Sequence, residues 1–384
     1  MSSRSHALAE RLEAGARKLA AFAGGPVDSV NAKQPAGGRV SRLGLVRRLA
    51  CLVLPAAIAV ACGADPAGPG PEPGPPIPDG LWTVSGSPPS IVRLAPEQLF
   101  GTGDRTPATE ITTPDLGLST LAGVAFGPDG RLWITSADNG LLLAFTPESL
   151  AGSGPRAATV TIASFRGSLD LPLGLAFDQA HRLWVANSGN GTLARFDPAD
   201  LAVSGAPAPA VVVSGVGQPR ALAFDAAGSL WVADNGAHRV VRYDAAQLAV
   251  SGSQVPAVTL TSSDASLLNP SGLAFDAGGT LWVSNLGGPS VVAFGPAQLA
   301  AGGTTKPEVV LTSTGGSLSL PTGLAFDADG SLWVGGATGV LTQVRPATLI
   351  ASGSPAPTAR LTIAGHSIFW SAAFRTNPAG LPLH

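Results

Sequence analysis

The sequence predicts an all-β protein, a six-bladed β-propeller of four-stranded antiparallel blades that is closed by pairing of the C-terminal strand with the first blade. Two observations predict it: a tryptophan-containing hairpin recurs at a nearly fixed period, and one copy is split between the two ends of the domain. The composition agrees, because 49 glycines, 34 prolines and only 12% charged residues are typical of many short strands joined by turns.

The hairpin is clearest in residues 269–285, where Leu273-Ala-Phe275 and Leu281-Trp-Val283 flank a short glycine-containing loop. Two apolar runs on either side of such a loop predict a β-hairpin. The hairpin tryptophans follow one another at intervals of 51, 51, 47, 51 and 51 residues, a period typical of propellers or solenoids. They are Trp82, Trp133, Trp184, Trp231, Trp282 and Trp333.

Each unit continues beyond its hairpin. In the fifth unit, apolar runs at 291–294 and 309–312 predict a third and a fourth strand. Between them, Pro296 and Leu299 predict a single helical turn, because proline suits the first helical position; Pro198 to Leu201 repeats the pattern. Four antiparallel strands in about 50 residues make one propeller blade.

The split unit predicts how the ring closes. Leu81-Trp-Thr83 has no partner run before it, and Ala372-Ala-Phe374 has no tryptophan run after it. An open ring would leave unpaired strand edges at both ends, and pairing the two runs removes them. We therefore expect residues 372–374 to be the innermost strand of the first blade, whereas a solenoid would carry polar capping repeats instead.

The chain before the propeller divides into three segments. Residues 1–45 are polar and alanine-rich, and are expected to be disordered or to precede the true start of translation. Residues 46–62 contain Arg47-Arg48 and 13 uncharged residues, which is short of the roughly 20 residues of a membrane-spanning helix but typical of a secretory signal. Residues 63–78 are a Pro/Gly-rich tether, and residues 79–384 form the propeller.

The signal segment ends in Ala59-Val-Ala-Cys62-Gly, which resembles the lipobox of bacterial lipoproteins. The resemblance implies lipidation at Cys62 after cleavage before that residue. It places the protein in the cell envelope, on the outer membrane or at the cell surface or periplasm, with its lipid anchor as the only membrane attachment.

Charge and cysteine content narrow the possible partners. The balance of 23 basic and 25 acidic residues does not indicate a nucleic acid. Cys51 and Cys62 both precede the propeller, so the propeller contains neither a disulfide nor a cysteine-ligated metal. We expect a monomer whose partner is a protein or a small-molecule ligand.

The segment Leu230 to Tyr243, Leu-Trp-Val-Ala-Asp-Asn-Gly-Ala-His-Arg-Val-Val-Arg-Tyr, resembles an NHL repeat. The Gly-Leu-Ala-Phe-Asp hairpins are similar to those of gluconolactonase and streptogramin-lyase propellers. The resemblance extends over all six units and implies a six-bladed propeller. These families include lactonases, lyases and binding modules, so the resemblance leaves the function open.

The residue three places after each hairpin tryptophan is expected at one mouth of the channel. Asn187, Asp234 and Asn285 hold this place in three consecutive units, and their oxygens suit a hard divalent cation such as Ca²⁺ or Mg²⁺. The alternative is that Asn and Asp favour the turn that ends the strand. No other cofactor is predicted.

The fourth unit is the exception in the repeat. The loop that leads into it, residues 214–219, is short and accounts for the 47-residue interval, so we expect a notch in the rim there. Around it we place a set of ligand-binding and catalytic candidates, in which His238 and Arg239 are the catalytic pair. The alternative is that these residue types are ordinary in NHL repeats. The set is Arg220, Asp234, Asn235, His238 and Arg239.

Two further patterns restrict the chemistry. An aspartate opens the hairpin loop in four units, where turn geometry explains it, at the opposite mouth: Asp178, Asp225, Asp276 and Asp327. Lactonases of the resembling family imply a metal set of one Glu, two Asn and one Asp near the inner strands. In each unit we consider the residue just before the glycine, or the alanine in the fourth unit, that opens the inner apolar run. No glutamate lies beside any of these residues, so gluconolactonase-type activity is not expected. They are Ala122, Leu173, Arg220, Ser271 and Thr322.

Two functions remain open. The first is an envelope-anchored propeller that acts as a binding scaffold for a ligand or a protein. The second is a metal-dependent lyase or hydrolase of the streptogramin-lyase or gluconolactonase type, with its site at the channel mouth near the fourth blade.

Overall fold

The computed structural model describes residues 79–113, 120–313 and 316–374, which belong to one compact unit. The segments expected at residues 1–45, 46–62 and 63–78, including Cys62, lie outside the described residues. Within the described ranges, no helix has the length and apolar character needed to cross a membrane.

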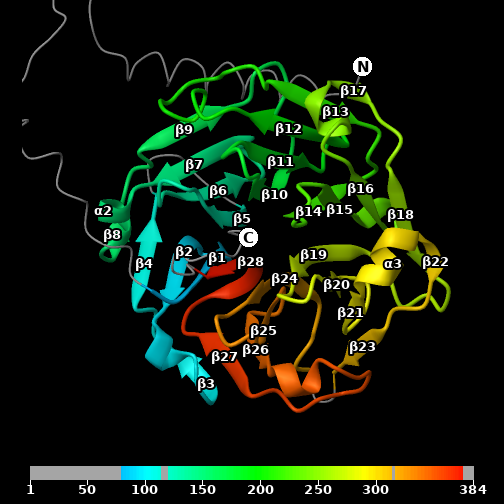
Figure 1. Ribbon diagram of the computed structural model, residues 1–384. Helices are drawn as coiled ribbons and strands as arrows, with labels where there is room; N and C mark the ends of the chain where they lie inside the picture. The colour runs from blue at the N-terminus through cyan, green and yellow to red at the C-terminus, as the bar shows by residue number, and fades with distance from the viewer. Residues whose placement is uncertain (1–78, 114–119, 314–315, 375–384) are drawn as a thin grey trace, which may run out of the picture. The chain divides into compact units, whose positions relative to one another are not determined.

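The described strands form six sheets around a common centre, which confirms the six-bladed propeller (Figure 1). The first blade consists of β28 (Ser367–Phe374), β1 (Leu81–Ser87), β2 (Pro89–Leu94) and β4 (Thr109–Thr112), from the centre outward. The second consists of β5 (Leu121–Phe126), β6 (Leu132–Ser136), β7 (Leu141–Phe145) and β9 (Val160–Ala163). The third consists of β10 (Pro172–Phe177), β11 (Leu183–Asn187), β12 (Thr192–Phe196) and β13 (Val211–Ser214).

The remaining three blades repeat the order. The fourth consists of β14 (Pro219–Phe224), β15 (Leu230–Asp234), β16 (Arg239–Tyr243) and β18 (Val258–Ser262). The fifth consists of β19 (Pro270–Phe275), β20 (Leu281–Asn285), β21 (Ser290–Phe294) and β23 (Val309–Thr312). The sixth consists of β24 (Pro321–Phe326), β25 (Leu332–Gly336), β26 (Val340–Val344) and β27 (Ala359–Ile363).

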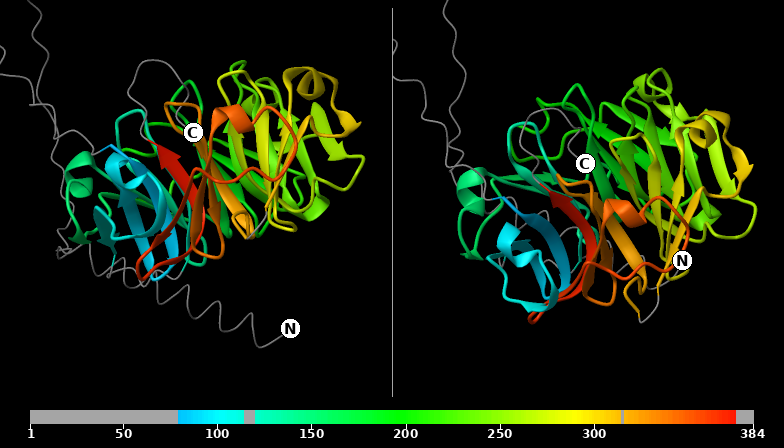
Figure 2. Two further views of the ribbon diagram at one scale, coloured as in Figure 1. Left: turned by 90° about the horizontal axis from the view of Figure 1, so that it is seen from below. Right: turned by 60° about the horizontal axis from the view of Figure 1, so that its bottom comes forward.

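The C-terminal strand closes the ring as predicted. Strand β28 pairs antiparallel with β1, with Phe374 opposite Leu81 and Ala373 opposite Trp82. In addition, the Thr83 hydroxyl donates a hydrogen bond of 2.6 Å to the carbonyl of Ser371. The first and last described strands therefore share one sheet, in which β28 (red) lies beside β1 (blue) and covers its inner edge (Figure 2).

A second seam, which the sequence did not predict, runs along the outside of the ring. The connection between the third and fourth strands of each blade reaches back and pairs in parallel with the outermost strand of the preceding blade (Figure 1). Short strands do this at four boundaries: β3 (Thr102–Arg105) on β27, β8 (Gly154–Pro155) on β4, β17 (Gly252–Ser253) on β13, and β22 (Gly303–Thr305) on β18. At the other two boundaries, Gly205 and Gly353 each form a single parallel bridge, to Ile162 and Leu311 respectively.

The short helical turns between the third and fourth strands are mostly as predicted. They are η1 (Pro96–Gln98), α2 (Pro147–Leu150), η4 (Gln247–Ala249), α3 (Pro296–Ala301) and η5 (Pro346–Thr348). At residues 198–201 the prediction was wrong, because the chain makes hydrogen-bonded turns there instead of a helix. A buried leucine anchors the segment in several blades, as Leu150 and Leu299 do.

The core lies between adjacent blades rather than within one. Each hairpin tryptophan is buried, and in four blades its ring meets the phenylalanine of the next inner strand with centroids 6.1–6.3 Å apart. An edge-on contact of two large rings combines buried apolar area with favourable ring electrostatics. The pairs are Trp82–Phe126, Trp231–Phe275, Trp282–Phe326 and Trp333–Phe374.

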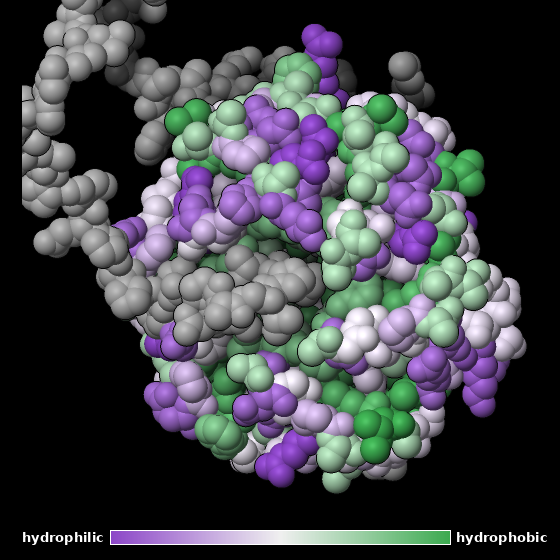
Figure 3. All heavy atoms as spheres, viewed as in Figure 1, coloured by the Kyte–Doolittle hydropathy of each residue, from purple (hydrophilic) through white to green (hydrophobic). Residues whose placement is uncertain are grey.

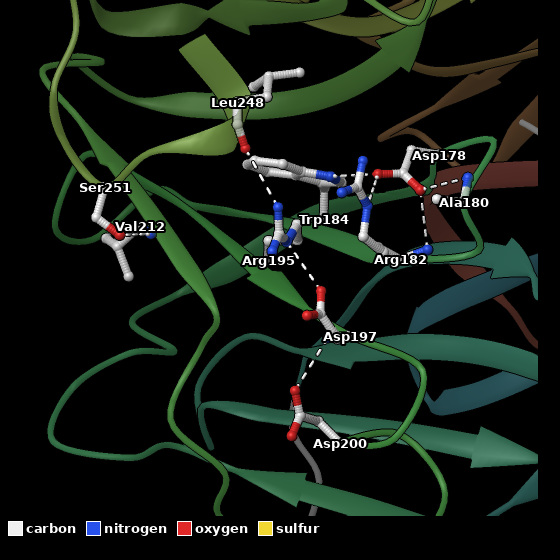
Figure 4. Close-up of polar contacts among 10 residues, drawn as sticks. All are labelled: Asp178, Ala180, Arg182, Trp184, Arg195, Asp197, Asp200, Val212, Leu248 and Ser251. Carbon is white, nitrogen blue, oxygen red and sulfur yellow. Dashed lines mark hydrogen bonds and ion pairs between the residues drawn. The ribbon is translucent and has the colours of Figure 1, made fainter. Parts of the chain in front are cut away.

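The repeated hairpin aspartates do more than form the turn that was predicted. In the third blade, one carboxylate oxygen of Asp178 accepts from the backbone N–H groups of Ala180 and Arg182, and the other from the Trp184 indole N–H at 3.1 Å (Figure 4). The buried indole thereby gains the partner that it requires. Asp225, Asp276 and Asp327 bind their own tryptophans in the same way, at 2.9–3.0 Å.

Candidate functional site

The innermost strands enclose a central channel with a cavity of about 70 Å³. Residues of β5, β10, β14, β19, β24 and β28 line it. Figure 3 shows hydrophobic residues in the hollow at the centre of the ring, beside a rim that carries many hydrophilic residues. Apolar side chains and a few polar groups share the wall of this concave cavity, a common form of a small-molecule site.

Glycines allow the inner strands to approach one another closely. A Cβ atom on Gly123, Gly174, Gly272 or Gly323 would lie only 2.1–2.6 Å from the backbone of the next inner strand. No side chain fits at that distance, which explains the repeated Gly-Leu-Ala-Phe motif. In the fourth and first blades the corresponding residues are Ala221 and Ser371.

The residue just before this glycine differs in every blade. The six residues, from the second blade round to the first, are Ala122, Leu173, Arg220, Ser271, Thr322 and Trp370. All except Thr322 line the cavity. The Thr322 hydroxyl is instead in contact with the carbonyls of Gly335 and Phe369.

Arg220 and Trp370 meet across the channel. The guanidinium carbon of Arg220 lies 5.4 Å from the centroid of the Trp370 ring, a cation–π contact. Arg220 belongs to β14 of the fourth blade and Trp370 to β28 of the first. In a ring of six these two blades stand opposite each other, so the contact spans the channel (Figure 1).

Arg220 carries the one charge on the described channel wall. Burial lowers its pKa, because the apolar surroundings disfavour the charged form. Within the described ranges, no acidic side chain forms an ion pair with it, and the hydroxyls of Ser271 and Ser371, on the same wall, have no hydrogen-bond partner. The channel therefore presents a cation and two hydroxyls whose bonding capacity is unused.

The predicted cation ligands Asn187, Asp234 and Asn285 lie at the ends of their second strands, fully buried. The Asn285 side-chain oxygen accepts from the N–H of Leu268 at 3.0 Å, and its amide donates to Ser266. The oxygens of all three bind the backbone of the loop that enters their own blade.

These hydrogen bonds leave the three side chains occupied within separate blades. Among the residues that the structure describes, no group of three or more His, Cys, Asp or Glu side chains could hold a metal ion. The present geometry therefore does not assemble an open ligand set from Asn187, Asp234 and Asn285, and a cation at these residues stays a prediction.

Most of the predicted set around the fourth blade gathers at its boundary with the fifth. Arg239 forms an ion pair of 2.8 Å with the buried Asp234. Asn235 donates from its amide to the carbonyl of Pro270. The exposed His238, in a left-handed conformation with φ of 51°, accepts the N–H of Asn269 at its Nδ1 atom (3.0 Å), which leaves the proton of the neutral ring on Nε2.

The structure separates Arg220 from this group. Pro219, its neighbour, pairs with Asp234 in the sheet, but the Arg220 side chain turns into the channel. The predicted short loop before the fourth blade is present, with four residues between β13 and β14 against eight between β9 and β10. Asp234 holds this loop by accepting the N–H groups of Gly217 and Gln218.

Sequence reasoning missed Trp370. It is the seventh tryptophan and the one outside the hairpin pattern. Aligning Trp370-Ser-Ala-Ala-Phe374 with the Gly-Leu-Ala-Phe repeats would have placed it in the same position as Arg220. That alignment was the available signal, since the position before the glycine is where the units differ.

Comparison with known proteins agrees with the fold. Residues 103–265 match the model of the SMP-30/Gluconolactonase/LRE-like region. Among curated proteins, none matches this chain in sequence.

Among solved structures, a protein of unknown function from Bacteroides caccae is 11% identical with a TM-score of 0.54, over 78% of this chain and 100% of the other. A chain of the nidogen/laminin complex is 14% identical with a TM-score of 0.53, over 76% and 96%. A streptogramin B lyase is 14% identical with a TM-score of 0.46, over 71% and 84%. At these identities the first two likenesses show the fold and not the activity.

The glycine-spaced inner strands and the tryptophan hairpins agree: this chain forms a six-bladed β-propeller, and its residues 103–265 are similar to the SMP-30/Gluconolactonase/LRE-like region.

Proposed function

We propose that this propeller is a ligand-binding module whose site is the central channel, and that Cys62 anchors it to the cell envelope. The observation that carries the binding proposal is the contact of Arg220 with Trp370 across the channel. Both residues stand at the inner-strand position that differs in all six blades. Elsewhere the repeats are nearly uniform, as a scaffold requires.

The uniform positions serve the ring itself. The hairpin aspartates satisfy the tryptophan indoles, and the side chains at the ends of the second strands hold the loops. Arg220 has no such role, because no described acid pairs with it and its side chain lies on the channel wall. A polar group that a scaffold does not use, placed in a cavity, is a candidate for contact with a ligand.

The lyase or hydrolase alternative depends on His238 and Arg239. In the structure Arg239 is paired with Asp234, and His238 accepts a backbone N–H at the boundary of two blades. Both side chains thus have contacts that explain them within the ring. We therefore place binding ahead of catalysis.

Filling the channel tests the binding proposal. Leu173 is half-buried on the channel wall, so Leu173→Phe should narrow the cavity without disturbing the core. We would screen the wild-type protein by thermal shift with a panel of small organic acids, amines, amides and sugars. We expect at least one compound to raise the wild-type Tm by several degrees and to lose that effect in Leu173→Phe.

The matched control is Val203→Phe, which adds the same bulk at a side chain that is 70% exposed on the outer rim. This variant should respond as the wild type does. If no compound of the panel raises the Tm, or if every effect persists in Leu173→Phe, the channel is not a binding site.

Anchoring is tested separately by labelling. We would express the chain in a bacterium supplied with radioactive palmitate and follow the label on the protein. Cys62→Ser should remove the label, and Cys51→Ser, which changes the other cysteine, should keep it. Label retained in Cys62→Ser would refute the proposed anchor.

A further inference from the structure

We propose that the channel takes a small monocarboxylate with a body of a few carbon atoms, whose carboxylate is held by Arg220. This inference rests on the proposed binding function and adds the class of ligand. Charge, shape and size of the cavity each contribute to it.

The charge of the site calls for one negative group. Arg220 is the single charged residue on the described channel wall, and its surroundings disfavour an unpaired charge. A bound carboxylate would supply the missing counter-charge through charge-assisted hydrogen bonds, which are stronger than neutral ones. A second negative charge on the ligand would find no cation on this wall.

The N–H groups of Arg220 are available for a ligand. The guanidinium carbon lies over the Trp370 ring at 5.4 Å, and the Arg220 side chain donates no hydrogen bond to the described residues. The N–H groups of a guanidinium point outward in its plane, where a carboxylate binds with two parallel hydrogen bonds. The protein thus leaves these donors open, while the cation–π contact with Trp370 keeps the guanidinium at the channel wall.

The lining and the volume of the cavity limit the size of the rest of the ligand. Apolar side chains such as Leu173 share the channel wall with the hydroxyls of Ser271 and Ser371. A cavity of about 70 Å³ has room for roughly five water molecules at about 10–15 Å³ each. The body of the ligand is accordingly only a few carbon atoms long.

A purely structural role for the pair gives a different expectation. If Arg220 and Trp370 only plug the channel, no small anion should bind there, and a side chain of similar length without charge should replace the arginine. A binding measurement, and not a stability measurement, therefore distinguishes the structural role of the pair from a role in ligand binding.

The test uses butyrate as the probe and isothermal calorimetry of the full chain. Butyramide and butylamine serve as isosteric neutral and cationic controls. We expect binding of butyrate at least tenfold tighter than of either control, at least a tenfold loss in Arg220→Met, and an intermediate loss in Arg220→Lys, which keeps the charge but not the planar fork.

Arg242→Met is the matched control. Arg242 also stacks on a tryptophan, Trp231 at 5.6 Å, but it is paired with Asp244 and is not on the channel wall. This variant should bind butyrate as the wild type does. A thermal melt of each variant verifies that it is folded.

The outcomes separate the two proposals. If a neutral compound binds in a Leu173→Phe-sensitive manner while butyrate does not, the channel remains a binding site and the carboxylate inference fails. If butyrate binds equally well in Arg220→Met, the inference also fails. If neither butyrate nor any compound of the earlier panel binds, the proposed function fails with it.

Discussion

The Trp333 ring contacts the Phe374 ring with centroids 6.1 Å apart, and this pair closes the circle of blades. It repeats the contact that Trp82 makes with Phe126 at the boundary of the first two blades. The closing boundary is therefore built like the boundaries inside the chain, including the outer seam, where β3 pairs with β27. Closure depends on the packing between blades as well as on hydrogen bonds.

The closing strand should be essential for stability. Phe369 of β28 is fully buried in the cluster that joins the sixth and first blades. Phe369→Ala removes a large core side chain and should lower the free energy of unfolding by about 3–5 kcal/mol, measured by chemical denaturation. Val255→Ala, at a residue that is 85% exposed, should change it by less than about 0.5 kcal/mol. Equal effects of the two substitutions would contradict this role of β28.

The hairpin aspartates should stabilise the blades through tryptophan. Asp225 accepts from the Trp231 indole at 2.9 Å and from the N–H groups of Ala227 and Ser229. Asp225→Ala leaves the buried indole N–H without its acceptor, so we expect a loss of about 2–3 kcal/mol in unfolding free energy. Asp329→Ala, at an exposed hairpin aspartate, is the control and should be nearly neutral. A loss below about 0.5 kcal/mol for Asp225→Ala would argue against the clamp.

The inner glycines should tolerate no side chain. The Cβ of an alanine at residue 272 would lie 2.1 Å from the Thr322 carbonyl oxygen of the next blade, and a rigid sheet cannot yield that much. Gly272→Ala should therefore destabilise by about 3 kcal/mol or more, or prevent folding, since overpacking of a rigid site is costly. Gly205→Ala, where no atom lies within 4 Å, should fold with a near-native Tm. A normal melting curve for Gly272→Ala would show that the blades are less tightly spaced.

Tyr243 should make the protein sensitive to alkali. Its buried hydroxyl has no hydrogen-bond partner among the described residues, and burial raises its pKa to about 12. An unfolded tyrosine titrates near pH 10, so the unfolded state loses its proton first. The contribution of the protonated Tyr243 to the free energy of unfolding is therefore fully present below pH 10, and it declines as the pH rises through about 12.

Tyr243→Phe removes the unpaired hydroxyl and, with it, the titration of residue 243. At pH 7 the variant should be as stable as the wild type or slightly more so, because no hydrogen bond is lost. Between pH 10 and 12 its unfolding free energy should fall less steeply than that of the wild type. Parallel pH profiles in denaturant melts would show that another group controls the alkaline limit.

Local patterns in the sequence were sufficient to determine the architecture. The hairpin period, the shared apolar runs and the split unit predicted six blades and the pairing of residues 372–374 with the first blade, which the structure confirms. They succeeded because each unit repeats the same short-range physics: alternating burial, glycine turns and an edge that must be paired.

The candidate site could be predicted only in part. Asn187, Asp234 and Asn285 have the oxygens of cation ligands, but the loops that fold over them use these atoms in hydrogen bonds. The residue type determines what a side chain can bind, but the surrounding residues determine whether its oxygen atoms are free to bind a cation. Sequence spacing could not supply those neighbours.

The sequence by itself thus determined the ring, its six blades and the way in which it closes, because these follow from patterns within about 50 residues. Only the tertiary structure decided that Arg220 and Trp370 share the channel. They are 150 residues apart in the chain and touch because the fourth and first blades of a closed ring of six face each other across its axis.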